Sequence, residues 1–263
     1  MTSRLKAVPL SRSGVKEKIL HIDRLSKGFH TAGGYVSVLD NVSFQAEGGE
    51  LIAILGRSGC GKSTLLKIVG GFIPPGSGKV LLNGSPVRSP GPDRCVIFQE
   101  DALFPWLTVQ ENIAFGLRGQ KQDKRSKAHQ VERFLGLVGL SEFRDYLPRA
   151  LSGGMKQRVA LARVLILQPQ VLLMDEPFAS LDAQSREEMQ NLLLSLWQEL
   201  GHTILFVTHD VSEAVILADR ILLMDKSPGR IREEIRLNLL RPRERESGAL
   251  LDFSRRLHQA LRD

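Results

Sequence analysis

The chain has few cysteines and no uninterrupted apolar run of membrane-spanning length. Two cysteines in 263 residues are too few for a disulfide framework, which indicates a reducing compartment. The most apolar region, 159–174, is interrupted by Arg163 and Pro169, so a segment that crosses a bilayer is not expected. The first residues are basic but contain no apolar core followed by a small-residue cleavage site, which argues against a secretion signal. We therefore expect a cytoplasmic chain that stays outside the bilayer.

Aromatic residues make up only 6% of the chain, although its net charge is +7 and its pI is about 9.6. Such a charge can indicate binding to nucleic acid, binding to an anionic membrane surface, or simply basic faces exposed to solvent. Zinc-ligand spacing, an RNP-type aromatic motif and a helix-turn-helix pattern are missing from the sequence, so nucleic acid is not expected as a partner. The excess lies mainly near the two ends, where we expect proximity to anionic lipid to be favourable. Towards the C-terminus it comprises Arg241, Arg243, Arg245, Arg255, Arg256 and Arg262.

Hydrophobic periodicity divides the chain into a flexible polar leader (1–16), a main domain (17–237) and a basic tail (238–263). The first part of the main domain is predicted to contain antiparallel strands at 19–25 and 36–46, a strand covered on both faces at 51–55, a helix at 62–69 and short strands within 76–86. A helical subdomain is predicted at about 102–167. After it, strands are predicted at 171–174, 203–208 and 221–224, with crossover helices at 186–200 and 211–218. In the tail, apolar residues near helical spacing are expected to pack on their own domain: Leu250, Phe253, Leu257 and Leu261. The pattern predicts an α/β fold with a parallel-sheet core, an antiparallel β subdomain and a helical subdomain.

The segment 56–64 reads GRSGCGKST and matches the pattern G-x-x-x-x-G-K-[ST]. Its glycines let the backbone fold around phosphates, and the following helix points its positive end at the same place. Lys62 would neutralise the β- and γ-phosphates, Ser63 would offer its hydroxyl to Mg²⁺, and Thr64 would reach the α-phosphate side. Cys60 is expected to satisfy only a size limit in this loop, and if its thiolate were accessible, a thiol reagent would block hydrolysis. The predicted phosphate loop comprises Gly56, Arg57, Ser58, Gly59, Cys60, Gly61, Lys62, Ser63 and Thr64.

Polar residues follow three further predicted strands, at the edge where ligands bind in an open parallel sheet. Asp175 would hold Mg²⁺ through water, while Glu176 would orient and polarise the water that attacks the γ-phosphorus. His209 would contact the γ-phosphate, and Gln99 would bridge Mg²⁺, the attacking water and the helical insertion. Without the phosphate loop, an acidic pair before Pro177 would suit a helix start equally well. A lone histidine would then more often be structural, and Gln99 would be an ordinary loop residue.

A second anion site is predicted at Ser152, Gly153 and Gly154, which precede a helix. A hydroxyl and two glycine N–H groups at a helix start favour negative charge. The alternative is a helix cap with a flexible entry. The helix has its apolar face at Val159, Ala162, Leu165 and Ile166.

These motifs together resemble the ATP-binding subunit of ABC transporters in order and spacing: the phosphate loop, Gln99, LSGGMKQR at 151–158, VLLMDE at 171–176, SLD at 180–182 and His209. The resemblance implies a P-loop NTPase with a RecA-like parallel-sheet core that hydrolyses ATP. It also implies a head-to-tail homodimer with ATP between Lys62 of one copy and Ser152 of the other, near Gly153, Gly154 and Asp182. An aromatic ring should stack on adenine; Phe29 is the better positional match, Tyr35 competes with it, and either ring could pack in the core instead.

The fragment DALFPWLTVQENIAFGL at 101–117 carries Leu103, Phe104 and Trp106, which could pack in the core. The family resemblance implies instead a groove for a cytoplasmic helix of a membrane permease. Within the family, SPGPDRCVIFQEDALFPW, LLLSLWQELGHTILFVTHDVSEAV and the RPR of the tail resemble the ATPases of sulfonate, taurine and nitrate importers. This implies uptake of aliphatic sulfonates or taurine through a permease dimer, with a solute-binding protein acting through it and this chain peripheral on the cytoplasmic face.

Three alternatives remain open at this stage. The solute could be nitrate or a related anion, the chain could be a non-transport ABC ATPase, or it could be a nucleotide sensor with negligible turnover.

Overall fold

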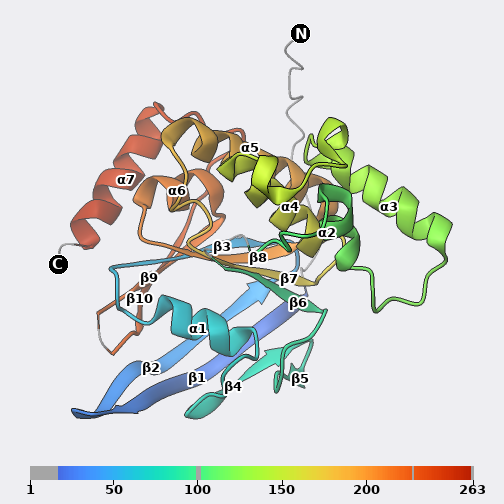
Figure 1. Ribbon diagram of the computed structural model, residues 1–263. Coiled ribbons are helices and arrows are strands. Elements are labelled where there is room, and N and C mark those ends of the chain that lie inside the picture. Colours follow the sequence, from blue (N-terminus) through green and yellow to red (C-terminus); the bar gives the residue numbers. More distant parts are fainter. Residues whose placement is uncertain (1–16, 99–101, 227, 262–263) are drawn as a thin grey trace.

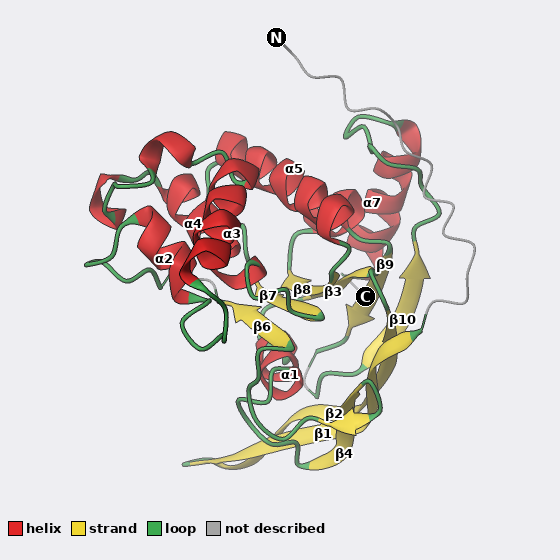
Figure 2. Ribbon diagram, turned by 90° about the vertical axis from the view of Figure 1, so that its right-hand side faces the viewer, coloured by secondary structure: helices red, strands yellow, loops and turns green. Residues whose placement is uncertain are grey.

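The computed structural model describes residues 17–98, 102–226 and 228–261 of the chain (Figure 1). The predicted leader (1–16) and Gln99 lie outside the described residues. Two sheets enclose helix α1 (Lys62–Val69), and the remaining helices cover the opposite face of the larger sheet (Figure 2).

The smaller sheet is antiparallel, with strand order β2-β1-β4-β5. Its strands are β1 (Lys18–Thr31), β2 (Gly34–Glu47), β4 (Ser77–Leu82) and β5 (Ser85–Pro86). β1 and β2 form a hairpin, because their pairing begins at Thr31 with Gly34 beside the turn and continues to Lys18 with Glu47. The alternation of buried and exposed residues gives this sheet one apolar face, which packs against α1 and the larger sheet. The two antiparallel strands predicted from alternation are confirmed.

The larger sheet has the order β10-β9-β3-β8-β7-β6. Its strands are β3 (Leu51–Gly56), β6 (Arg94–Ile97), β7 (Val171–Asp175), β8 (Thr203–Thr208), β9 (Arg220–Met224) and β10 (Ile231–Arg236). β3 is apolar throughout because Leu51, Ala53 and Leu55 enter the core on the helical side. Ile52 and Ile54 enter the core around α1. β10 was not predicted: it adds to β9 in antiparallel orientation and is rich in exposed charge, which hides its strand pattern.

The helical region contains α2 (Val109–Phe115), α3 (Lys124–Leu137) and α4 (Gly153–Leu165), with short 3-10 turns at Ser141–Phe143 and Pro148–Ala150. The crossover helices are α5 (Ala183–Leu200) and α6 (Val211–Leu217). The predicted apolar face of α4 is buried in the core on the helical side of the larger sheet. Among the described residues, no helix combines the length and apolar character that crossing a membrane requires.

The tail forms α7 (Gly248–Ala260), which packs on the chain's own core as predicted. Leu250 and Leu257 are buried there, and Phe253 and Leu261 pack against them. The expectation that tail arginines lie against anionic lipid is wrong for those that are folded inward. These are Arg241, which pairs with Asp219, and Arg243, which donates to backbone carbonyls of Val215 and Ala218.

Candidate nucleotide site

The phosphate loop connects the buried strand β3 directly to α1. Gly59 and Gly61 have φ values of 80° and 98°, in the left-handed region that favours glycine. At Gly61, a Cβ atom would also lie 2.8 Å from Leu39 Cδ2, so the loop is closely packed against β2. The helical hydrogen bonds of α1 begin at Leu65 N, which donates to Gly61 O. The N–H groups before Leu65 are therefore left without helical acceptors at the positive end of α1, which suits a phosphate.

Lys62 is buried and lies across its own loop. Its Nζ donates to Gly56 O at 2.8 Å and to Arg57 O at 3.1 Å. The ammonium group is thus held among loop residues, and phosphate oxygens would replace these carbonyls as its acceptors. This geometry agrees with the role predicted for Lys62.

The Ser63 hydroxyl and the Asp175 carboxylate converge, with Ser63 Oγ donating to Asp175 Oδ1 at 2.9 Å. Burial raises the pKa of Asp175 above its ordinary value, and the hydrogen bond from Ser63 partly opposes the shift. In the described part of the chain, no group of three or more His, Cys, Asp or Glu side chains is arranged to hold a metal. One hydroxyl and one carboxylate fit Mg²⁺ of the kind that is bound together with substrate phosphates.

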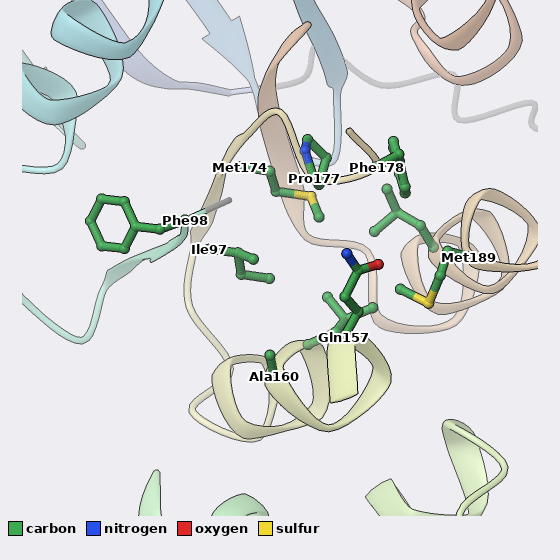
Figure 3. Close-up of a pocket in the computed structure, with 10 residues that line it drawn as sticks. Ile97, Phe98, Gln157, Ala160, Met174, Pro177, Phe178 and Met189 are labelled. Atoms are coloured by element: carbon green, nitrogen blue, oxygen red, sulfur yellow. The ribbon is translucent and has the colours of Figure 1, made fainter. Parts of the chain in front are cut away.

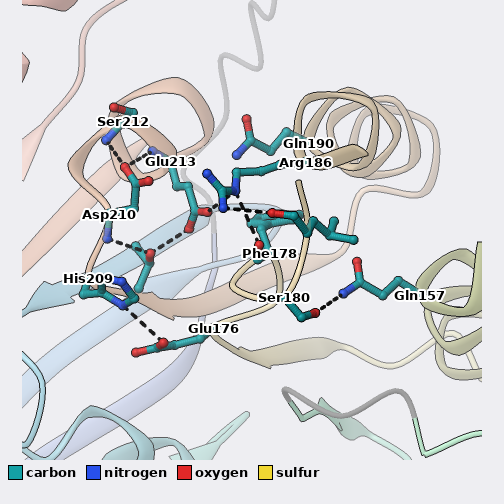
Figure 4. A network of polar contacts seen from close by, with 12 residues as sticks. Gln157, Glu176, Phe178, Ser180, Arg186, Gln190, His209, Asp210, Ser212 and Glu213 are labelled. Atoms are coloured by element: carbon teal, nitrogen blue, oxygen red, sulfur yellow. Dashed lines mark hydrogen bonds and ion pairs between the residues drawn. The ribbon is translucent and has the colours of Figure 1, made fainter. Parts of the chain in front are cut away.

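Glu176 and His209 meet at the carboxyl edge of the larger sheet (Figure 4). Glu176 follows β7, His209 follows β8, and His209 Nδ1 lies 3.1 Å from Glu176 Oε2. The backbone of Glu176 has φ 47° and is fixed by its N–H, which donates to Val207 O at 3.1 Å. A non-glycine residue in this region is strained, and such strain concentrates at functional sites. Neighbouring carboxylates thus have different partners, since Asp175 contacts Ser63 and Glu176 contacts His209.

Ser152 and Asp182 serve as caps of their own helices. Ser152 Oγ accepts from Met155 N at 3.3 Å at the start of α4. Asp182 Oδ1 accepts from Ser185 N at 3.0 Å at the start of α5. The helix-cap interpretation of Ser152 therefore holds within one chain. Ser152 and Gly153 are also exposed, so they remain available to a ligand or to a second copy.

The two candidate adenine-stacking rings lie on opposite faces of the β1–β2 hairpin. Phe29 pairs with Val36, whereas Tyr35 pairs with His30, and successive residues of a strand face opposite sides. Leu39 approaches the phosphate loop at Gly61, and it pairs with Lys27, which lies two residues before Phe29 on β1 and so shares its face. This places Phe29 on the face nearer the phosphate loop. The ring of Tyr35 instead lies over Gly28, where an added Cβ would be 2.4 Å from it.

Cys60 does not present an accessible thiol. Its side chain is 1% exposed and lies against Gly56. Burial raises the pKa of the Cys60 thiol, and Lys62 only partly opposes this shift. The folded chain therefore does not offer the accessible thiolate on which a block by thiol reagents would depend.

The predicted permease groove is exposed only in part. Trp106 is 71% exposed, whereas Leu103 is partly buried against the core and Phe104 packs on Phe115 with ring centroids 4.3 Å apart. Phe72 and Phe98, which sequence reasoning did not select, form an exposed edge-to-face pair near the end of β6. Phe72 and Phe98 are far apart in the sequence and only the fold brings them together, so the sequence carried no signal for this pair.

A small apolar cavity of about 20 Å³ lies behind the carboxyl ends of β6 and β7, between α4 and α5 (Figure 3). It is lined by residues such as Ile97, Met174, Phe178 and Met189. Ligand sites enclose roughly 300 Å³ or more. This cavity is therefore too small for a nucleotide and is a packing feature.

Sequence reasoning missed three polar residues beside this edge: Arg186, Thr208 and Glu213. Glu213 is buried in the first turn of α6, where its carboxylate accepts from Thr208. The signal for it was a single acidic residue within the apolar stretch 211–218. A charge at such a position needs a partner inside the fold.

Residues 39–179 match the family model described as ABC transporter. The chain is 45% identical over 244 residues to an uncharacterized ABC transporter ATP-binding protein of Methanocaldococcus jannaschii, covering 93% of this chain and 91% of the relative. It is 44% identical over 243 residues to the nitrate import ATP-binding protein NrtD of Synechococcus elongatus, covering 91% of this chain and 89% of the relative. It is 50% identical over 205 residues to the taurine import ATP-binding protein TauB of Pelagibacter ubique, covering 78% and 77%.

Solved structures agree with these relatives. CbiO1 of Clostridium perfringens, part of the ABC transporter complex CbiONQ, has a TM-score of 0.75 and 30% identity over 83% of this chain and 88% of its own. A dimeric bacterial ABC transporter cassette has a TM-score of 0.73 and 29% identity, covering 84% of this chain and 100% of its own. The α/β cassette architecture predicted from the motifs is therefore confirmed. This chain belongs to the ABC transporter family, as an ATP-binding and ATP-hydrolysing subunit of the kind that powers import.

Proposed function

We propose that two copies of this chain energise the uptake of aliphatic sulfonates or taurine through a membrane permease. The taurine import ATPase at 50% identity supports this class of solute. The nitrate import relative at 44% identity keeps small oxyanions as the second candidate. A solute-binding protein acting through the permease would select the solute.

The observation that carries the catalytic part of the proposal is the contact of Glu176 with His209 beside Lys62 and the Ser63–Asp175 pair. Lys62 binds the β- and γ-phosphates, and Glu176 orients the attacking water and accepts its proton. His209, which lies next to Glu176, donates a hydrogen bond to the γ-phosphate. Mg²⁺ bound with ATP would be held by Ser63 and Asp175, and by Gln99 if that side chain reaches it. It would supply charge neutralisation at the phosphates.

The second copy completes the proposed site. Ser152, Gly153 and Gly154 of one copy face the ATP bound by Lys62 of the other, with Asp182 at the same interface. A dimeric bacterial cassette of the same fold supports this arrangement. The exposed aromatic residues Trp106, Phe72 and Phe98 form the proposed docking surface for the permease, which places the chain at the cytoplasmic face of the membrane.

Replacing Glu176 with Gln tests the catalytic assignment. The variant should bind Mg-ATP with nearly normal affinity, because glutamine keeps the size and the hydrogen-bonding capacity of the side chain. Steady-state hydrolysis should fall by about a hundredfold or more, because the general base is gone. Glu142→Gln, at an exposed position in a 3-10 turn, is the matched control and should hydrolyse ATP normally. Undiminished turnover in Glu176→Gln would remove Glu176 from the mechanism.

The solute is tested by reconstituting the chain with its permease and solute-binding protein in vesicles. ATP-dependent accumulation of taurine or a short alkanesulfonate is the expected result. Accumulation of nitrate alone would establish the second candidate, and hydrolysis without uptake of either would refute the proposed solute class.

A further inference from the structure

A buried charged network lies beside the nucleotide site and connects two of its loops (Figure 4). The Glu213 side chain is only 6% exposed, and its Oε2 accepts from Thr208 Oγ1 at 2.6 Å. Arg186, in the first turn of α5, places its Nε 3.7 Å from Glu213 Oε1. Arg186 therefore supplies positive charge to a carboxylate that has almost no access to water.

Arg186 also holds the turn that follows Glu176. Its Nη2 donates to Leu181 O at 3.0 Å, and its Nε donates to Phe178 O at 3.4 Å. This turn leads directly into Asp182, the cap of α5. A planar guanidinium can reach two carbonyls and a carboxylate at once, whereas the ammonium of a lysine cannot reproduce this geometry.

On the other side, Thr208 fixes the chain around His209. Its hydroxyl donates to Glu213 and accepts from Asp210 N at 3.0 Å, so the residues before and after His209 are tied together. The position of His209 relative to Glu176 therefore depends on the anchor that Glu213 provides. The charged groups that act on Glu213 are Arg186 on α5, Asp210 at the start of α6, and His209 when protonated.

We propose that Arg186 is a positioning residue for hydrolysis, holding His209 against Glu176 through Glu213 and Thr208 while it holds the turn after Glu176 through two carbonyls. The proposal rests on the roles proposed above for Glu176 and His209. Loss of Arg186 leaves the Glu213 carboxylate buried without a cation and frees both loops. A displacement of about 1 Å at a reacting group can cost on the order of a hundredfold in rate.

The test is a double-mutant cycle on Mg-ATP hydrolysis with Arg186→Lys, His209→Ala and the double variant. Arg186→Lys should lower kcat about tenfold and change KM for ATP by less than about twofold. In the His209→Ala background the same change should lower kcat by about threefold or less, because only the turn after Glu176 is then left for Arg186 to position. Arg133→Lys is the matched control, since Arg133 forms an exposed pair with Glu199 on α5 and should leave kcat unchanged.

Thermal unfolding separates positioning from stability alone. Arg186→Gln should lower Tm, and adding Glu213→Gln should restore most of the loss, because the buried carboxylate that lost its cation is then removed as well. The proposal predicts that kcat stays low in this double variant. Recovery of kcat together with Tm would overturn it, because Arg186 would then act only on stability.

Two further results decide the proposal. An equal loss of kcat from Arg186→Lys in both backgrounds would refute the dependence on His209. Normal kcat in Arg186→Lys, with His209→Ala still slow, would overturn this inference and leave the proposed function intact. Normal hydrolysis by His209→Ala itself would remove the proposed role of His209 and this inference with it.

Discussion

Cys60 shows how the packing of one residue changes its chemistry. The phosphate loop turns the side chain inward, against Gly56, where a Cβ atom would lie 2.8 Å from the Cys60 sulfur. The other thiol, Cys95, is partly buried, and burial together with the charge of Asp93 raises its pKa to about 11. Both thiols are therefore mainly protonated near neutral pH, and the thiolate is the reactive form.

We expect both thiols of the folded chain to react with a disulfide reagent about a hundredfold more slowly than those of the unfolded chain. The measurement is a thiol titration with and without denaturant, and a Cys95→Ser variant separates the two signals. Rapid titration of Cys60 in the native protein would contradict the burial of its side chain.

Glu213 gives the second prediction at the residue scale. Burial raises the pKa of Glu213 above its ordinary value of 4.5, so the ionised form is disfavoured in the folded state. Stability from the neutral carboxyl is fully present below the unfolded pKa and is lost as pH rises through the folded pKa. Glu213→Gln should therefore gain stability relative to the unsubstituted protein as pH rises above about 4.5.

Urea unfolding of both proteins across this pH range checks the expected sign. A stability difference that is constant with pH, or that grows in the opposite direction, would show that the pKa of Glu213 is not raised. If Glu213→Gln were both more stable and slower in hydrolysis, the buried charge of Glu213 would cost stability while positioning His209.

At the scale of elements, α6 depends on caps supplied from outside its seven residues. At its start, Asp210 Oδ1 accepts from Ser212 N at 2.7 Å. At its end, Arg243 Nη1 donates to Val215 O at 2.6 Å and to Ala218 O at 2.7 Å. Burial and the nearby charge of Arg241 lower the pKa of Arg243 to about 10, which still leaves it protonated at neutral pH. The tail therefore satisfies the carbonyl groups that the helix leaves unpaired at its C-terminus.

Arg243→Ala should lower the free energy of unfolding by about 2–3 kcal/mol, because charge-assisted hydrogen bonds to buried carbonyls are lost. Arg255→Ala is the matched control on the same tail, since Arg255 is exposed and pairs with Asp252, which is also exposed. Its effect should stay below about 0.5 kcal/mol. Denaturant unfolding measures both, and similar values for the two variants would refute a capping role for Arg243.

At the scale of the whole molecule, the predicted site needs two copies. Within one chain the Ser152 hydroxyl caps α4, while Lys62 lies in the loop after β3. The proposed head-to-tail dimer would bring Lys62 of one copy to Ser152 of the other, which would give two equivalent sites.

Mixing two inactive variants tests this arrangement. Lys62→Ala and Ser152→Arg should each abolish hydrolysis alone, because every site of either homodimer is damaged. In an equimolar mixture, half of the dimers should hold one intact site, so activity should return to about a quarter of the normal value. A mixture as inactive as its components would refute sites shared between copies, and Arg133→Lys mixed with Lys62→Ala controls for dilution.

Much of the site could be predicted from the sequence because its parts are local. The glycines of the phosphate loop, Lys62 and Ser63 are contiguous, and their pattern carries the strand, the loop and the helix start together. Asp175 and His209 follow apolar strands, so their place at one edge of the sheet follows from parallel topology. The exposed strand β10 was not predictable in the same way, because its pairing with β9 involves backbone groups rather than an apolar face.

The sequence by itself determined the phosphate loop, the strand-edge carboxylates and the family, since each depends on residue types at fixed spacing along the chain. Only the tertiary structure decided that Phe29 and Tyr35 lie on opposite faces, that Cys60 is buried, and that Arg186 reaches Glu213. The physical reason is that burial, strand register and ion pairing join residues far apart in the chain. Their energies depend on which groups folding brings together and removes from water.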